Sequence, residues 1–154
     1  MDIKVRTNIS KEFNDIEIDI NAPEKNEEVQ RIENYLLTEN AKSIKTILGM
    51  QDNNIFIIDT QEIITVFGEG KTNYCKTKNG RYRIKEKLYY LEEVLPTKQF
   101  IRISNSCIVN VKKVKCFDVS LVGRMVIKLE DGSSEIVSRR RIPEIMKFLK
   151  ERCD

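Results

Sequence analysis

The sequence predicts a mostly β protein of the α+β class, with many short strands and few helices. Several segments alternate apolar and polar residues or run through β-branched residues, as strands do. Two dipeptides that favour tight hairpin turns, Asn79-Gly80 and Asp131-Gly132, separate neighbouring segments of this kind. Apolar residues at helical spacing occur in only three places, so helices are the minor component.

Residues 1–60 predict a small β-β-α extension. Residues 3–9 and 15–20 alternate apolar and polar side chains, which favours two half-buried strands joined as a hairpin. Asn26 is a candidate N-cap for a helix that ends near residues 38–40. The apolar residues of this helix share one face: Val29, Ile32 and Leu36. Because such an arm is too small to be stable alone, we expect it to pack on the rest of the chain or on a second copy, with a role in dimerisation or regulation.

Residues 61–154 are expected to form a second, larger domain, after further strand candidates at residues 43–50 and 55–58. A stretch from Phe100 to Val111 opens like a buried strand and closes on another apolar patch. Two helices are expected, one over residues 85–95 that Pro96 stops and one that starts after Ser138. The other strands are predicted at residues 62–67, 74–78, 81–84, 114–119, 125–129 and 134–137.

The net charge of +3 is divided unevenly along the chain. Residues 1–60 contain 7 Lys and Arg against 12 Asp and Glu, a balance of −5. Residues 61–154 contain 20 against 12, a balance of +8. The basic part could therefore face a polyanion, whereas the acidic part would be repelled by one.

Composition argues against several classes of function. The chain has no histidine, which removes Ser-His-Asp and Cys-His catalysis and the commonest zinc sites. Its four cysteines show no CxxC spacing and are expected to be core residues or spectators. We therefore expect no enzyme activity, no metal and no cofactor. No apolar run approaches the ~20 residues of a membrane helix and the first residues do not resemble a signal peptide, so a cytoplasmic location is expected.

The segment Gly68-Glu69-Gly70-Lys71-Thr72 suggests a phosphate-binding P-loop, but the rest of that motif is absent. The motif needs a glycine where Thr65 stands, and it opens a helix, whereas strand signals follow here. We interpret Lys71-Thr72-Asn73 instead as a polar tip between two strands.

Three polar tips end β elements in the basic part of the chain: Lys71-Thr72-Asn73, Ser104-Asn105-Ser106 and Arg139-Arg140-Arg141. Asn can pair with adenine N6 and N7, Arg with guanine O6 and N7, and Lys and Thr suit phosphates. If the sheets carry these tips on one edge, they form a surface that reads DNA without a recognition helix. The alternatives are a Ser or Asx turn, a plain surface connection and a solubilising charge cluster.

Taken together, residues 62–150 resemble the LytTR-type DNA-binding domain of bacterial transcription regulators. The resemblance rests on segments in the family's order and at about its spacing: residues 63–71, 77–80, 88–95, 100–110, 131–132 and 137–139. It implies stacked small antiparallel sheets with one or two short helices. It also implies that loops between strands enter successive major grooves on one face of DNA.

The resemblance further implies roles for particular residues. The family's base-contacting asparagine falls on Asn105 and its base-contacting arginine on Arg139, with Arg140 one position away. Its first recognition loop falls near residues 71–73. Most relatives carry a phosphorylated receiver domain ahead of this part, for which the preceding 60 residues leave no room. The chain thus resembles the stand-alone subgroup of these regulators, and control by aspartyl phosphorylation within the chain is not expected.

We therefore expect a sequence-specific transcription regulator that binds double-stranded DNA as a homodimer on paired sites. Lys112 and Arg141 are the first candidates for phosphate contacts. One alternative is a protein-interaction module whose acidic arm docks a sensor or a small membrane protein. Another is an RNA binder that stacks bases on aromatic rings, which is disfavoured because the tyrosines of the larger domain lie in predicted strands and helices rather than in the tips.

Overall fold

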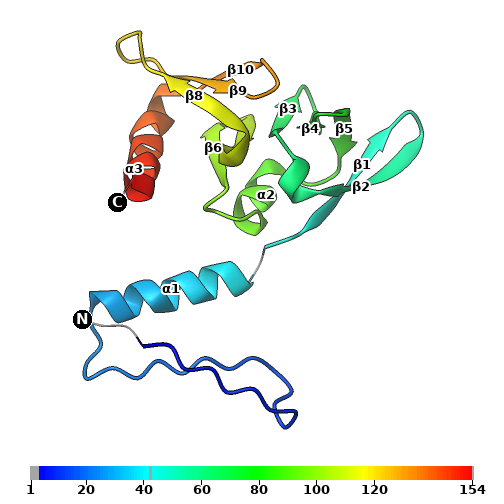
Figure 1. Ribbon diagram of the computed structural model, residues 1–154. Coiled ribbons are helices and arrows are strands. Elements are labelled where there is room, and N and C mark those ends of the chain that lie inside the picture. Colours follow the sequence, from blue (N-terminus) through cyan, green and yellow to red (C-terminus); the bar gives the residue numbers. More distant parts are fainter. Residues whose placement is uncertain (1–3, 42, 154) are drawn as a thin grey trace. The chain divides into compact units, whose positions relative to one another are not determined.

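The computed structural model describes residues 4–41 and 43–153 (Figure 1). The chain divides into two compact units, one that ends at Leu37 and one that begins at Thr38. Most of a single long helix lies in the first unit, and the second unit contains both β-sheets.

Helix α1, Glu27–Ala41, begins where the sequence predicts a helix. The side-chain oxygen of Asn26 accepts a hydrogen bond from the backbone N–H of Val29 at 3.0 Å, which confirms Asn26 as the N-cap. Two glutamates occupy the first turn, where the helix dipole favours acidic side chains. The predicted apolar face is half-buried at each of its three positions: Val29, Ile32 and Leu36.

The strands predicted at residues 3–9 and 15–20 are wrong for the described part of these segments. Residues 4–9 and 15–20 form no β-ladder, and Figure 1 draws them as an irregular trace. Their apolar side chains are open to solvent, with Val5, Ile9 and Ile16 between 85% and 92% exposed. Alternation stabilises a strand only where a neighbouring strand takes up the backbone hydrogen bonds and another surface covers the apolar side. Residue 3 lies outside the described residues.

A seven-stranded antiparallel sheet, in the order β2-β1-β5-β4-β3-β7-β6, is the largest element of the second unit. It contains β1 Thr46–Gln51, β2 Asn54–Asp59, β3 Thr65–Glu69, β4 Thr72–Thr77, β5 Gly80–Ile84, β6 Phe100–Ser104 and β7 Cys107–Asn110. This sheet confirms the mostly β, antiparallel architecture that the sequence predicts.

Strands β1 and β2 belong to this sheet, although the sequence groups them with the N-terminal extension. Met50 of β1 pairs with Arg83 of β5. The backbone N–H of Ile44 also donates to the carbonyl of Val94 at 2.9 Å. The two compact units therefore divide between residues 37 and 38, before the predicted boundary at residue 60, because backbone pairing rather than charge composition sets the division.

A second, three-stranded sheet has the order β10-β9-β8. Its strands are β8 Val114–Asp118, β9 Val126–Leu129 and β10 Ser134–Ile136. The unit also contains helices α2 Leu88–Val94 and α3 Ile142–Cys153, and the 3-10 turns η1 Thr60–Glu62, η2 Val111–Lys113 and η3 Arg139–Arg141. Helix α2 is shorter than predicted, and the helix predicted after Ser138 is divided into η3 and α3.

Two clusters of buried side chains lie on opposite faces of the large sheet, because successive strand residues point to opposite sides. Phe100 and Ile108 belong to the cluster that includes α2. Ile101 and Val109, one position further along each strand, belong to the cluster that includes β9 and α3. Strands β6 and β7 are therefore packed on both faces, which fixes the turn that joins them.

Candidate nucleic-acid interface

The turn between β6 and β7, residues 104–106 and here called the serine turn, is stabilised by its own side chains. The hydroxyl of Ser104 accepts a hydrogen bond from the backbone N–H of Ser106 at 3.2 Å, and the two hydroxyl oxygens lie 3.4 Å apart. This is the local serine turn that was one interpretation of the sequence. The side chain of Asn105 takes no part in these two contacts, and the residue is exposed at the tip.

The 3-10 turn Arg139–Arg141, here called the arginine turn, lies against the serine turn. The backbone N–H of Ser138 donates to the carbonyl of Ile103 in β6 at 2.9 Å, which places the arginine turn beside the end of that strand. Nη2 of Arg140 then donates to Oδ1 of Asn105 at 3.0 Å. Two of the three predicted tips, 35 residues apart along the chain, therefore meet through their side chains.

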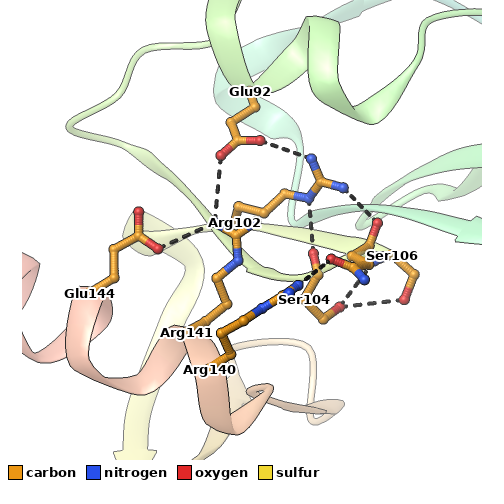
Figure 2. Close-up of polar contacts among 8 residues, drawn as sticks. Glu92, Arg102, Ser104, Ser106, Arg140, Arg141 and Glu144 are labelled. Carbon is orange, nitrogen blue, oxygen red and sulfur yellow. Dashed lines mark hydrogen bonds and ion pairs between the residues drawn. The ribbon is translucent and has the colours of Figure 1, made fainter.

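Arg102 binds the backbone of the serine turn. Its Nε donates to the carbonyl of Ser104 at 2.9 Å and its Nη2 to the carbonyl of Asn105 at 2.6 Å. Its Nη1 donates to Oε2 of Glu92 in α2 at 2.8 Å, as Figure 2 shows. Arg102 and Glu92 were not among the site residues predicted from the sequence. The sequence did contain a signal for Arg102, since it stands between two isoleucines of a predicted strand. Successive strand residues point to opposite sides, so its charge lies on the side of β6 away from these buried isoleucines.

The three arginines of the arginine turn differ in their surroundings. Nη1 of Arg141 lies 3.2 Å from Oε2 of Glu144 and 3.8 Å from Oε1 of Glu92, and its side chain is only 21% exposed (Figure 2). By contrast, the side chain of Arg139 is exposed and makes no hydrogen bond or ion pair with any described residue. The exposed Arg124 lines the same surface hollow as Arg139, so a further cation that was not predicted from the sequence lies nearby.

The hairpin between β3 and β4 carries the third predicted tip to the same end of the large sheet. The backbone N–H of Gly68 donates to the carbonyl of Ser106 at 2.8 Å, and the β3–β4 turn at Gly70 and Lys71 follows. Lys71 is exposed, whereas Nδ2 of the half-buried Asn73 donates to the carbonyl of Glu86 at 3.0 Å. Thr72 is half-buried in β4, so Lys71 is the member of this tip that is most open to a ligand.

Lys112 does not join the two turns. It lies in η2, which follows the C-terminal end of β7, whereas the serine turn precedes the N-terminal end of that strand. Four strand residues separate these ends by on the order of 13 Å. Among the predicted site residues, the structure therefore separates Lys112 from the serine and arginine turns.

The cysteines and acidic residues provide no second site in the described part of the chain. Burial raises the pKa of the Cys75 and Cys107 thiols to about 12, so both are protonated core residues, as expected. Cys116 is exposed. No group of three or more potential metal ligands occurs among the described residues. Within residues 4–41 and 43–153, no helix has the length and apolar character needed to cross a membrane.

Fold and site together define a β-sheet domain that presents basic and amide side chains on adjoining turns. Comparison with known proteins shows which family has this kind of domain. The family model described as "LytTr DNA-binding domain" matches residues 53–150. Uncharacterised HTH-type transcriptional regulators of Staphylococcus aureus strains MRSA252 and NCTC 8325 are each 35% identical over 135 residues, which cover 88% of this chain and 87% of theirs. A solved LytTr DNA-binding domain from Bacillus cereus matches with a TM-score of 0.67 at 20% identity, over 70% of this chain and 98% of that chain.

The chain belongs to the LytTR family of DNA-binding domains. The Bacillus cereus domain shares its fold, which confirms the fold that the resemblance implies. Membership also confirms that the chain is not an enzyme. The staphylococcal relatives are named after the helix-turn-helix, but in the described residues strands separate α1, α2 and α3, so no two of these helices form that motif.

Proposed function

We propose that this protein is a sequence-specific transcription regulator that inserts the serine turn and the arginine turn into the major groove of double-stranded DNA. The observation that carries the proposal is the 3.0 Å contact between Nη2 of Arg140 and Oδ1 of Asn105. Through this contact, two segments distant in sequence form one surface of groups that suit base edges.

Arg140 orients the amide of Asn105. Because the guanidinium can only donate, the amide atom that faces it is the acceptor oxygen. That oxygen has a second lone pair, which can accept from the N6 amino group of adenine while Nδ2 donates to N7. An amide that is oriented before binding loses less rotational freedom when it meets the base.

The residues of the arginine turn have different surroundings, and we assign them different roles accordingly. Arg139 has an exposed guanidinium with no partner among the described residues, so we assign it to guanine O6 and N7. Arg140 supports Asn105. Lys71, exposed on the neighbouring hairpin, is assigned to a phosphate.

We further infer a homodimer on paired sites. The N-terminal unit exposes apolar side chains that a second copy would cover: Val5, Ile9, Ile16 and Ile18. Two linked basic domains would bind neighbouring half-sites more tightly than one, because the second contact becomes intramolecular. A regulator of this kind acts on the chromosome, so we propose a cytoplasmic location.

A second candidate function is contact with another protein through the β1–β2 hairpin. Strand β2 is an edge of the large sheet, with one side of its backbone unpaired. The cross-strand neighbours Leu48 and Ile57 are 56% and 76% exposed, and Ile55 is 67% exposed. An apolar edge of this kind favours a protein partner, such as a sensor or a small membrane protein.

Selection of bound duplexes from a random-sequence library tests the DNA-binding proposal. The expected result is a short common motif that recurs at a spacing of whole helical turns, about 10–10.5 base pairs each. Footprinting of the DNA upstream of the protein's own gene would then locate a natural site. Recovery of no common motif would contradict sequence-specific binding and would favour the protein contact as the primary role.

A further inference from the structure

An ion-pair network lies next to the serine and arginine turns and connects them (Figure 2). Glu92 of α2 places Oε2 at 2.8 Å from Nη1 of Arg102 and Oε1 at 3.8 Å from Nη1 of Arg141. Arg102 donates to two carbonyls of the serine turn, and Arg141 is part of the arginine turn. A single carboxylate therefore contacts both Arg102, which binds the serine turn, and Arg141, which belongs to the arginine turn.

We propose that Glu92 is a positioning residue that determines specificity, because it fixes the two turns in one geometry and keeps Arg102 and Arg141 away from DNA phosphates. This inference rests on the proposed DNA-binding function. Although Glu92 lies outside both turns, it sets the ratio of the affinity for the preferred sequence to the affinity for random DNA.

The charges of the network cancel. Arg102 and Arg141 are matched by Glu92 and Glu144, which lies 3.2 Å from Arg141. The remaining two arginines of the arginine turn have no acidic partner among the described residues. The network thus separates two guanidinium groups that carboxylates neutralise from two that no carboxylate neutralises: Arg139, assigned to a base, and Arg140, which holds the amide of Asn105.

Loss of the Glu92 charge would release Arg102. The side chain of Arg102 is only 13% exposed, and without the Glu92 carboxylate its guanidinium would be a poorly solvated charge with no opposite charge beside it. A guanidinium in this position gains by turning toward water or toward a phosphate. The carbonyls of Ser104 and Asn105 would then lose their partner, and the serine turn would lose its fixed geometry.

Loss of the Glu92 charge should have opposite effects on binding to random DNA and on binding to the preferred sequence. Binding to random DNA depends on the number of phosphate contacts, and each added contact steepens the dependence of log affinity on log salt by about one unit. Binding to a preferred sequence depends on the placement of Asn105 and Arg139 against base edges. Released arginines therefore strengthen the first kind of binding, and a loosened turn weakens the second.

The test compares Glu92→Gln with Glu93→Gln in the full chain. Both glutamates lie in α2 and are exposed, and both substitutions raise the net charge by one. The side chain of Glu93 makes no hydrogen bond or ion pair with any described residue, so this variant reports the effect of overall charge alone. Each variant is titrated with a duplex recovered by selection and with a random-sequence duplex of equal length, at several salt concentrations.

We expect Glu92→Gln to lower the ratio of specific to random affinity about tenfold, with tighter binding to random DNA and a steeper salt dependence. Glu93→Gln should leave the ratio within about a factor of two. Equal ratios in the two variants would overturn the proposal. A wild-type protein that does not distinguish the two duplexes would overturn the proposed function itself, so the two failures are distinguishable.

Thermal unfolding of each variant shows whether it is folded. If Glu92→Gln does not fold, Arg102→Lys takes its place, since lysine keeps the charge but cannot reach both carbonyls and the carboxylate at once. This variant should lower the specific affinity without strengthening binding to random DNA. An unchanged ratio in a folded Arg102→Lys protein would overturn the role assigned to the network.

Discussion

Lys76 and Asp131 connect β4 of the large sheet to the β9–β10 turn of the small sheet. Nζ of Lys76 lies 3.0 Å from Oδ2 of Asp131 and donates to the hydroxyl of Ser133 at 2.7 Å. Desolvation raises the pKa of Asp131, but hydrogen bonds from Ser133 and Lys76, together with the lysine charge, outweigh it and lower the pKa to about 2. Protonation of the Asp131 carboxylate at acid pH should therefore break its ion pair with Lys76 in the folded protein.

Replacement of Asp131 by Asn should flatten the dependence of stability on pH at acid pH. The pKa of this carboxyl is 3.8 in an unperturbed chain and about 2 in the folded protein, so the unfolded chain binds more protons between these values. Its contribution is fully present above pH 3.8 and is lost as the pH falls through about 2. Urea unfolding of both proteins at a series of pH values measures this, and identical slopes would show that the contact does not stabilise the fold.

Three asparagines show what residue type alone could and could not predict. Asn105 was assigned to a base contact from the resemblance to LytTR domains, and the structure puts it at an exposed tip. Asn73 had the same appearance in the sequence, but its side chain donates to the carbonyl of Glu86. Asn110 is fully buried and donates to the carbonyl of Ile63 at 2.7 Å. The partners of Asn73 and Asn110 lie 13 and 47 residues away, so only the folded structure separates these roles.

At the scale of elements, alternation predicted strands correctly where a neighbour and a core were present. Strands β3 to β7 satisfy both conditions, and their turn residues support the same pairing. Residues 4–9 and 15–20 show equally regular alternation and form no strand. The pairing of the serine and arginine turns depends on contacts between segments 35 residues apart, which local patterns do not contain.

Removal of the N-terminal arm tests its proposed role in pairing two chains. A chain that begins at Ser43 keeps β1 and the hydrogen bond between Ile44 and Val94, so it should fold. It should bind a single half-site as well as the full chain does and lose the advantage of a paired site. Sedimentation of both proteins and titrations on single and paired half-sites measure these differences.

A shortened chain that still prefers paired sites would place the dimer contact in the second unit. The exposed edge at Leu48, Ile55 and Ile57 would then be the first surface to change, with Ile57→Lys as the variant. Failure of the shortened chain to fold would show instead that residues before Ser43 belong to the core.

For the molecule as a whole, the end of the large sheet that carries the serine turn should dominate the salt dependence of DNA binding. Lys71 lies at the end that carries the serine turn, and Lys112 lies at the other end of β7. Lys71→Ala should reduce the slope of log affinity against log salt by about one unit on specific and random DNA alike. Lys112→Ala is the matched control and should leave the slope unchanged. The opposite pattern would place the DNA on the other end of the sheet.

Direct titration of alanine variants tests whether Asn105 and Arg139 contact bases. Asn105→Ala and Arg139→Ala should each cost about 1–3 kcal/mol on a duplex recovered by selection and far less on random DNA, because bidentate contacts to base edges exist only on the preferred sequence. Asn79→Ala, an exposed asparagine in the turn at the opposite end of β4, is the control and should change neither affinity. Equal losses on both DNAs would show that the substituted residue contacts phosphate and does not contact a base.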